Sequence, residues 1–148
     1  MKKVKIAHIG VYGVLIKDES ILLIKKVNGP YKGKLDLPGG SIEFGERPDN
    51  ALIRELKEET GLCITKYEFN NSDSVVVKWH YDEKEITTHH IGIFYAIKSY
   101  KGEVKNRVRI DDKNDDSLGA NFYKIKDLKV DEISSITKLQ LEKLGYFK

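Results

Sequence analysis

The chain of 148 residues has few of the features that mark secreted, membrane-spanning or nucleic-acid-binding proteins. Its single cysteine, Cys63, cannot form a disulfide within the chain, which is compatible with a reducing cytoplasm. No apolar run approaches the ~18 residues that a membrane-spanning helix needs. The net charge of +3 is too small to indicate a DNA-binding surface and would not repel an anionic small molecule. We therefore expect a cytoplasmic protein that binds neither membranes nor specific nucleic acids, with Cys63 buried as a small apolar side chain.

The length and the even composition predict one globular domain over residues 1–148. No long linker, internal repeat or low-complexity tract interrupts the chain. The basic N-terminus is not followed by a long apolar core or a cleavage site, so we interpret it as a first strand and not as a signal peptide.

Apolar patterning predicts strands, a helix, more strands and a closing helix. The expected strands cover residues 11–16, 21–27, 67–79, 86–97 and 120–125. A hairpin turn is expected at residues 17–20 and a charged loop or strand end at 105–117. The expected helices cover residues 47–59 and 132–144. This order predicts an α/β domain with a mixed β-sheet packed between helices.

The helix predicted over residues 47–59 has clear start and stop signals. Pro48 suits its first turn, and Asp49 or Glu46 places negative charge near its start. Gly61 is expected to end it, because glycine readily adopts the left-handed conformation that closes helices.

Glu55, Glu58 and Glu59 share one face of this helix because their spacing is i, i+3, i+4. The neighbouring face carries Leu52, Ile53, Leu56 and Thr60. Like charges this close repel, and the repulsion grows with burial, which we expect to be greatest for Glu59. A divalent cation would offset the repulsion, and Mg²⁺ prefers carboxylate oxygens. The alternative interpretation is a solvated acidic face paired with Arg54 and Lys57.

A sharp loop directly precedes the helix, where Gly39 and Gly40 follow Pro38. Paired glycines permit backbone conformations closed to other residues and a close approach of a ligand. A loop of this kind beside an acidic helix predicts a cradle for a metal ion and a diphosphate.

Residues 40–62, which read GSIEFGERPDNALIRELKEETGL, resemble the Nudix (MutT-like) hydrolase family. They match the Nudix box without a gap. The matching positions are Gly40, Glu46, Arg54, Glu55, Leu56, Glu58, Glu59, Gly61 and Leu62. One departure lies upstream, where many relatives carry a tryptophan and this chain has Leu35.

The resemblance implies an α/β/α sandwich that hydrolyses a nucleoside diphosphate linked to another moiety. It implies metal ligation of Mg²⁺, or Mn²⁺ in its place, by the side chains of Glu55, Glu58 and Glu59 and by the carbonyl of Gly40. It further implies that Arg54 orients the acidic cluster and that Gly39, Glu46 and Gly61 support the loop and the helix. The rival interpretation is a nonhydrolytic module that senses a nucleotide or sugar nucleotide on the same fold. The chain could also form a homodimer.

The general base for attack by water stays open. Glu55 and Glu58 are candidates within the box. Acids in other segments are further candidates, for each of which a solvated loop acid is the favoured alternative: Glu83, Glu85, Asp111, Asp112, Asp115 and Asp116.

Substrate choice is expected to depend on residues outside the box. No proline follows Pro48, so the proline-containing signatures of ADP-ribose, NADH and coenzyme A hydrolases are missing. By elimination we predict a small nucleotide, such as a nucleoside triphosphate. Trp79 and Tyr81 would share a strand face and could stack on a base, or they could be a packed or surface aromatic pair. The adjacent His89 and His90 would face opposite sides and are poor joint metal ligands.

Overall fold

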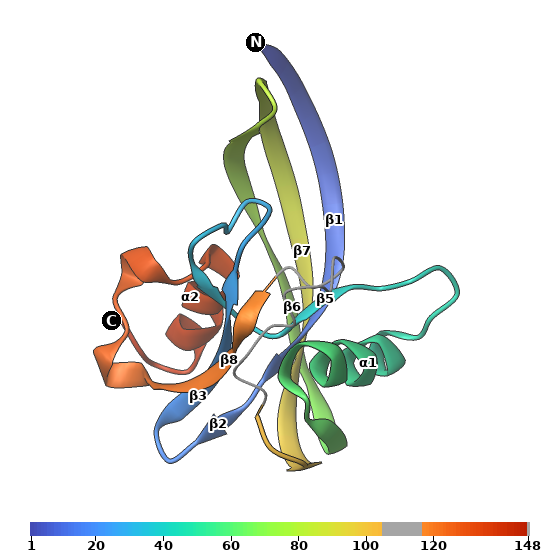
Figure 1. The fold of residues 1–148 in the computed structure, drawn as a ribbon, viewed down its shortest axis with the longest axis vertical. Helices are drawn as coiled ribbons and strands as arrows, with labels where there is room; N and C mark the ends of the chain where they lie inside the picture. Colours follow the sequence, from blue (N-terminus) through green and yellow to red (C-terminus); the bar gives the residue numbers. More distant parts are fainter. Residues whose placement is uncertain (105–116, 148) are drawn as a thin grey trace.

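The computed structural model describes residues 1–104 and 117–147, which form two four-stranded sheets and two α-helices (Figure 1). The strands are β1 (Lys2–Val14), β2 (Ile16–Lys17), β3 (Ser20–Lys26), β4 (Leu35–Asp36), β5 (Gly39–Ser41), β6 (Cys63–Tyr81), β7 (Lys84–Lys101) and β8 (Ser117–Lys124). The helices are α1 (Pro48–Thr60) and α2 (Ser135–Lys143), with short 3-10 helices at Ile125–Asp127 and Val130–Glu132.

One sheet is mixed and the other is antiparallel. The mixed sheet has the order β5-β1-β7-β6, in which β1 and β7 are parallel. In the second sheet, β3 pairs with β2, β4 and β8. The sequence predicted a single sheet, whereas the structure places the strands in two sheets.

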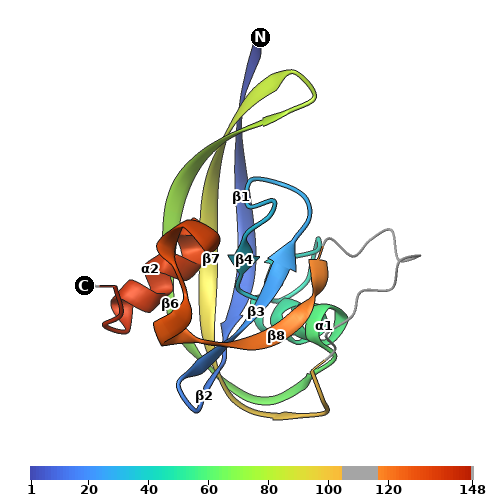
Figure 2. The same ribbon diagram turned by 60° about the vertical axis from the view of Figure 1, so that its left-hand side comes forward.

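The two helices lie on opposite sides of the second sheet, as Figures 1 and 2 show. Strand β3 is buried on both faces: Leu22 and Ile24 pack into the core that contains α1, and Ile21 and Leu23 pack into the core beneath α2. A continuous apolar run is what a strand covered on both faces requires, and each such side chain contributes about 1.5–3 kcal/mol on burial. This arrangement confirms the α/β/α sandwich.

The mixed sheet extends beyond the cores as an arm formed by β1, β6 and β7 (Figure 1). Its register places His8 opposite His90 and Ile6 opposite Thr88. Trp79 lies opposite Ile86 on the other flank of β7. Side chains from three strands thereby meet on one face of the arm.

Several predicted elements are confirmed. Helix α1 begins at Pro48, and Gly61 ends it in the left-handed conformation with φ of 84°. The hairpin turn between β2 and β3 lies at Asp18 and Glu19, both of which have positive φ.

Two predictions are wrong in detail. Helix α2 begins three residues later than expected, because extended Ile133 pairs with Leu35 and the Ser134 side chain caps the helix by accepting the Thr137 N–H. Cys63 is exposed, because it begins β6 with its side chain on the solvent side while Leu62 and Ile64 fill the core. Leu35, the position at which the sequence departs from the expected family pattern, is buried.

We predict that Gly61→Ala destabilises the protein by about 1 kcal/mol, since a Cβ is disfavoured at positive φ. Urea denaturation would measure the change in the free energy of unfolding. Asn50→Ala, at an exposed position of the same helix, is the control and should change it by less than about 0.5 kcal/mol. Equal stability of the Gly61 variant and wild type would contradict the proposed strain.

Candidate functional site

Helix α1 presents the three glutamates at the edge of a cavity. Leu52 and Leu56 are fully buried and fix the orientation of the helix against the sheets. Glu59, next to this apolar face, is only 6% exposed, and its Oε1 accepts the backbone N–H of Gly39 at 2.7 Å. Glu59 therefore ties α1 directly to β5, and its predicted burial is confirmed.

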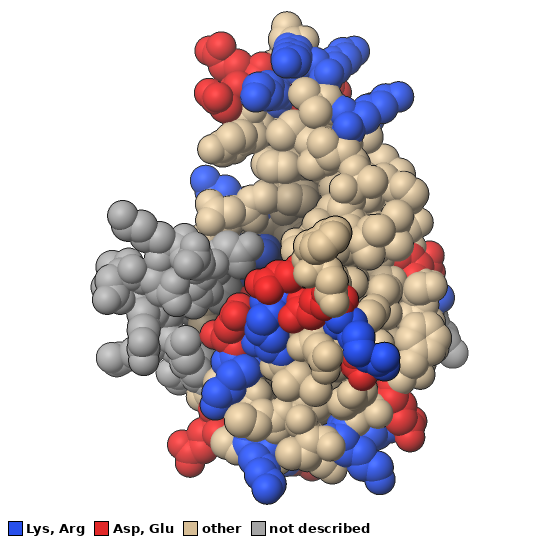
Figure 3. Space-filling model, turned by 90° about the vertical axis from the view of Figure 1, so that its right-hand side faces the viewer, with Lys and Arg blue, Asp and Glu red and all other residues tan. Residues whose placement is uncertain are grey.

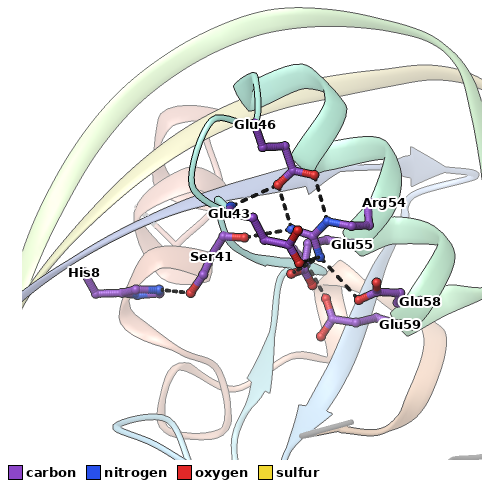
Figure 4. Close-up of polar contacts among 9 residues, drawn as sticks. His8, Ser41, Glu43, Glu46, Arg54, Glu55, Glu58 and Glu59 are labelled. Carbon is purple, nitrogen blue, oxygen red and sulfur yellow. Dashed lines mark hydrogen bonds and ion pairs between the residues drawn. The ribbon is translucent and has the colours of Figure 1, made fainter. Parts of the chain in front are cut away.

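The guanidinium of Arg54 joins the helix to the loop before it (Figure 4). Its Nε and Nη2 donate to the two carboxylate oxygens of Glu46 at 2.8 and 2.9 Å. Nη2 also donates to the carbonyl of Ser41 at 3.0 Å. Nη1 contacts Glu55 at 3.0 Å and Glu58 at 3.5 Å. Nη1 also lies 3.8 Å from Glu43, so one cation contacts two of the three glutamates and three residues of the preceding segment.

These contacts change the ionisation of Glu46. Hydrogen bonds from Arg54, and then from the backbone N–H of Glu43, lower the pKa of Glu46 to about 2. The same contact with Glu46 raises the pKa of Arg54. Both groups therefore stay charged across the physiological pH range.

The two glycines of β5 allow the loop to approach β1 and α1 closely. Gly39 has φ of 144°, and a Cβ there would collide with the carbonyl oxygen of Val11. A Cβ on Gly40 would lie 3.0 Å from the Glu55 carboxylate. The Gly40 backbone therefore lies directly against an acidic side chain, as the sequence predicted for a cradle.

The donor set suits a hard divalent cation. Glu55, Glu58, Glu59 and the carbonyl of Gly40 are all oxygen donors, and all four residues line one cavity. Across residues 1–104 and 117–147, no three acidic, histidine or cysteine side chains converge tightly enough to hold a metal ion. Arg54 contacts both Glu55 and Glu58 in this arrangement. The chemistry of the donors fits Mg²⁺, whereas their roles as ligands stay predictions.

The cavity has a volume of about 580 Å³, within the usual range for small-molecule sites. Figure 3 shows acidic and basic side chains gathered beside a hollow in the surface. The acidic half of the cavity is lined by Gly39, Gly40, Ser41, Glu55, Glu58 and Glu59. The ring-lined half contains His8, Tyr12, Tyr31, Trp79, Thr88 and His90.

Sequence reasoning missed most of the ring-lined half. His8 had no identifiable partner, but its Nε2 lies 2.8 Å from the Ser41 hydroxyl. His90 is buried and hydrogen-bonded to the hydroxyls of Tyr12 and Tyr31. Because residues 87–90 are all polar, the sequence carried no alternation that would have marked Thr88 and His90 as facing the cavity.

The other candidate acids lie away from the cavity or outside the described residues. Glu83 lies in the β6–β7 turn and Glu85 at the start of β7, both at the far end of the arm, and neither lines the cavity. Asp111, Asp112, Asp115 and Asp116 fall outside the described residues. Trp79 lines the cavity, and Tyr81 is 65% exposed with its ring centroid 6.2 Å from that of Trp79.

The fold and the glutamate-bearing face of α1 indicate the class of this protein, and the comparison with known families agrees. The NUDIX domain matches residues 7–143, so the chain belongs to the Nudix family. Among solved structures, a MutT Nudix hydrolase from Burkholderia pseudomallei has the same fold, with a TM-score of 0.70 and 24% identity, covering 94% of this chain and 98% of that chain.

Two curated proteins illustrate the similarity in sequence. An ADP-ribose pyrophosphatase from Methanocaldococcus jannaschii is 36% identical over 120 residues, which cover 81% of this chain and 63% of that protein. An 8-oxo-dGTP diphosphatase from Escherichia coli is 32% identical over 106 residues, covering 70% of this chain and 72% of that protein. The chain therefore matches less than two thirds of the length of the first relative. No helix among the described residues is long and apolar enough to cross a membrane.

We predict that Glu46→Gln lowers stability in a pH-dependent way. Because the pKa of Glu46 is lowered, its contact with Arg54 stabilises the folded state fully above the ordinary value near 4.5, and this stabilisation is lost as the pH falls toward 2. The difference in free energy of unfolding between wild type and Glu46→Gln should therefore be constant above pH ~5 and shrink below it.

Urea denaturation at a series of pH values would measure this difference. Arg54→Met is the matched variant: in that background, Glu46→Gln should produce a much smaller pH-dependent change, because the donor is gone. If the difference in free energy of unfolding between wild type and Glu46→Gln stays constant down to pH 2, the ion pair does not have the role given to it here.

Proposed function

We propose that this chain hydrolyses a diphosphate linkage in a nucleotide, with Mg²⁺ as its metal ion and Mn²⁺ as a substitute. The observation that supports this proposal is the meeting of Glu55, Glu58, Glu59 and the Gly40 backbone at one end of a cavity of ligand size. Substrate phosphates and protein carboxylates are the partners that Mg²⁺ usually bridges.

In this proposal, Glu55, Glu58, Glu59 and the Gly40 carbonyl hold the metal. When bound, the metal would neutralise phosphate charge and lower the pKa of a water. Arg54 is a positioning residue, because it holds Glu46 and the Ser41 carbonyl against α1 and also contacts Glu55. Gly39 positions Glu59 through its N–H, and Gly61 ends the helix directly after the glutamates.

The proton acceptor is proposed to be a carboxylate near the attacked phosphorus. Glu55 and Glu58 differ in their surroundings: the Glu55 side chain is 15% exposed and lies 3.0 Å from Arg54, while the Glu58 side chain is 59% exposed. Glu58 is therefore the more accessible to solvent water. An acid between residues 111 and 116 remains an alternative base.

We predict that Glu58→Gln reduces both hydrolysis and Mg²⁺ affinity. Mutation of a residue that hydrogen-bonds to a metal ligand typically lowers metal affinity or activity by about 10–100-fold. Removing the charge of a ligand itself should lower them at least as much. Isothermal titration calorimetry would measure Mg²⁺ binding, and the rate of diphosphate cleavage would be followed in parallel. Glu142→Gln, at an exposed position of α2, is the control and should leave both unchanged. Near wild-type values for the Glu58 variant in both measurements would refute its assignment as a ligand.

The substrate is proposed to be a nucleoside triphosphate. The chain lacks a proline after Pro48, so it lacks the signature associated with ADP-ribose hydrolysis. The two relatives named above nevertheless include an ADP-ribose pyrophosphatase and an 8-oxo-dGTP diphosphatase. ADP-ribose is therefore the competing substrate. A cytoplasmic location and pairing as a homodimer remain predictions.

A nucleotide screen with Mg²⁺, in which phosphate and pyrophosphate are detected separately, would test this choice. We expect nucleoside triphosphates to release pyrophosphate, because attack at the inner phosphorus leaves a nucleoside monophosphate. Cleavage of ADP-ribose would release neither ion directly and would be seen as AMP. AMP formation without pyrophosphate release from any triphosphate would favour ADP-ribose. Mg²⁺ binding without turnover of any diphosphate would favour the nonhydrolytic sensing module.

A further inference from the structure

We propose that the ring-lined half of the cavity binds a planar heteroaromatic group, the base of a nucleotide, against Trp79 and the His8–His90–Tyr31 cluster. The orientation of the nucleotide in the cavity rests on the proposed function, since its diphosphate would occupy the acidic half. The cavity is continuous between these two groups of residues, so one ligand can contact both.

Strand register explains how the rings meet. Tyr12 pairs with Gly39 at the edge of the acidic half. His8 lies four residues before Tyr12 in β1, further from the glycine loop. His8 pairs with His90 across β1 and β7, and their ring centroids are 5.1 Å apart with planes at 30°. The ring of Tyr31 lies 5.5 Å from that of His90 at 36°. The rings of His8, His90 and Tyr31 are therefore close together and only moderately tilted, whereas Tyr12 meets His90 edge-on at 75°.

The rings that line this half are already held in place by hydrogen bonds. Trp79 Nε1–H donates to the Thr88 hydroxyl at 2.9 Å. The His90 nitrogens lie 2.5 Å from the Tyr12 hydroxyl and 2.8 Å from the Tyr31 hydroxyl. A ligand that stacks here would not have to order these side chains, which reduces the entropic cost of binding.

The pKa values of both histidines of this half are lowered, which favours their neutral forms. Burial, and then the nearby charges of His8 and Lys26, lower the pKa of His90 to about 4. Burial, and then Lys26, also lower the pKa of His8. Among the described residues, the charged side chains that line this half are Lys26 and Asp36, one of each sign. An uncharged base matches this wall better than a second phosphate group does.

The cluster also offers a hydrogen-bond donor. A neutral imidazole has one N–H and one bare nitrogen, so one tyrosine donates to His90 and the other accepts from it. The accepting tyrosine keeps a hydroxyl hydrogen that the imidazole does not use. Ring nitrogens and carbonyl oxygens of a base are suitable acceptors for such a hydrogen.

The chain carries its own reporter, because Trp79 is its single tryptophan. We would titrate the full chain with guanosine, adenosine, cytidine and uridine in EDTA, and follow tryptophan fluorescence. We expect a saturable change with at least one nucleoside. Ribose 5-phosphate and inorganic pyrophosphate, which lack the ring, should produce no saturable change. No saturable change with any nucleoside, or the same change with ribose 5-phosphate, would overturn the proposal.

A matched pair of variants tests the role of Trp79 by calorimetry. Trp79→Leu should weaken binding of the best nucleoside by about tenfold or more, as expected for the loss of one stacking contact. Tyr81→Leu lies two residues further along β6 on the same face but does not line the cavity, so its affinity should equal that of wild type. Equal affinities of both variants would contradict the stacking role.

The two proposals can fail separately. Turnover of a diphosphate without metal-free nucleoside binding would overturn the base site and leave the hydrolytic function standing. Nucleoside binding without turnover of any diphosphate would support the base site and overturn the hydrolytic function.

Discussion

The contacts of Arg54 hold the acidic face of α1 against the loop that precedes it. Glu55, Glu58 and Glu59 would repel one another on a bare helix face. Arg54 offsets this repulsion through Glu55 and Glu58, and it fixes the preceding loop through Glu46 and the Ser41 carbonyl. Because the carbonyl it binds belongs to the residue after Gly40, the distance between the glycine backbone and the acidic helix depends on this guanidinium together with the Glu59–Gly39 hydrogen bond. A lysine could supply the charge but not this forked geometry.

The acidic half of the site was predictable because its information is local. Helical spacing alone placed Glu55, Glu58 and Glu59 on one face, and Gly61 marked the end of that face. Periodicity could not decide whether the face was solvated or functional. The glycine pair before the helix and the ungapped Nudix box made that distinction, and the packing of Gly40 against Glu55 gives its physical reason.

The ring-lined half was not predictable because its residues come from strands whose pairing is not encoded locally. His8 and His90 are 82 positions apart in the numbering and meet only because β1 and β7 run parallel in one particular register. A slip of one strand by one residue would place the two rings on opposite faces of the sheet. The same limit explains the late start of α2: the helical periodicity includes Ile133, but pairing with Leu35 keeps that residue extended.

Ser41 connects the two halves of the cavity and sets the distance between them. Its carbonyl accepts from Arg54, whereas its hydroxyl meets His8, which packs against His90 (Figure 4). The acidic half and the ring-lined half are therefore each held by a different group of one residue in a short strand, the carbonyl and the hydroxyl of Ser41. Under the two proposals, the helix would determine the reaction class and the arm would determine the choice of substrate. A ligand that spans from the glutamates to Trp79 would use both, so the spacing through Ser41 would favour substrates of a matching length.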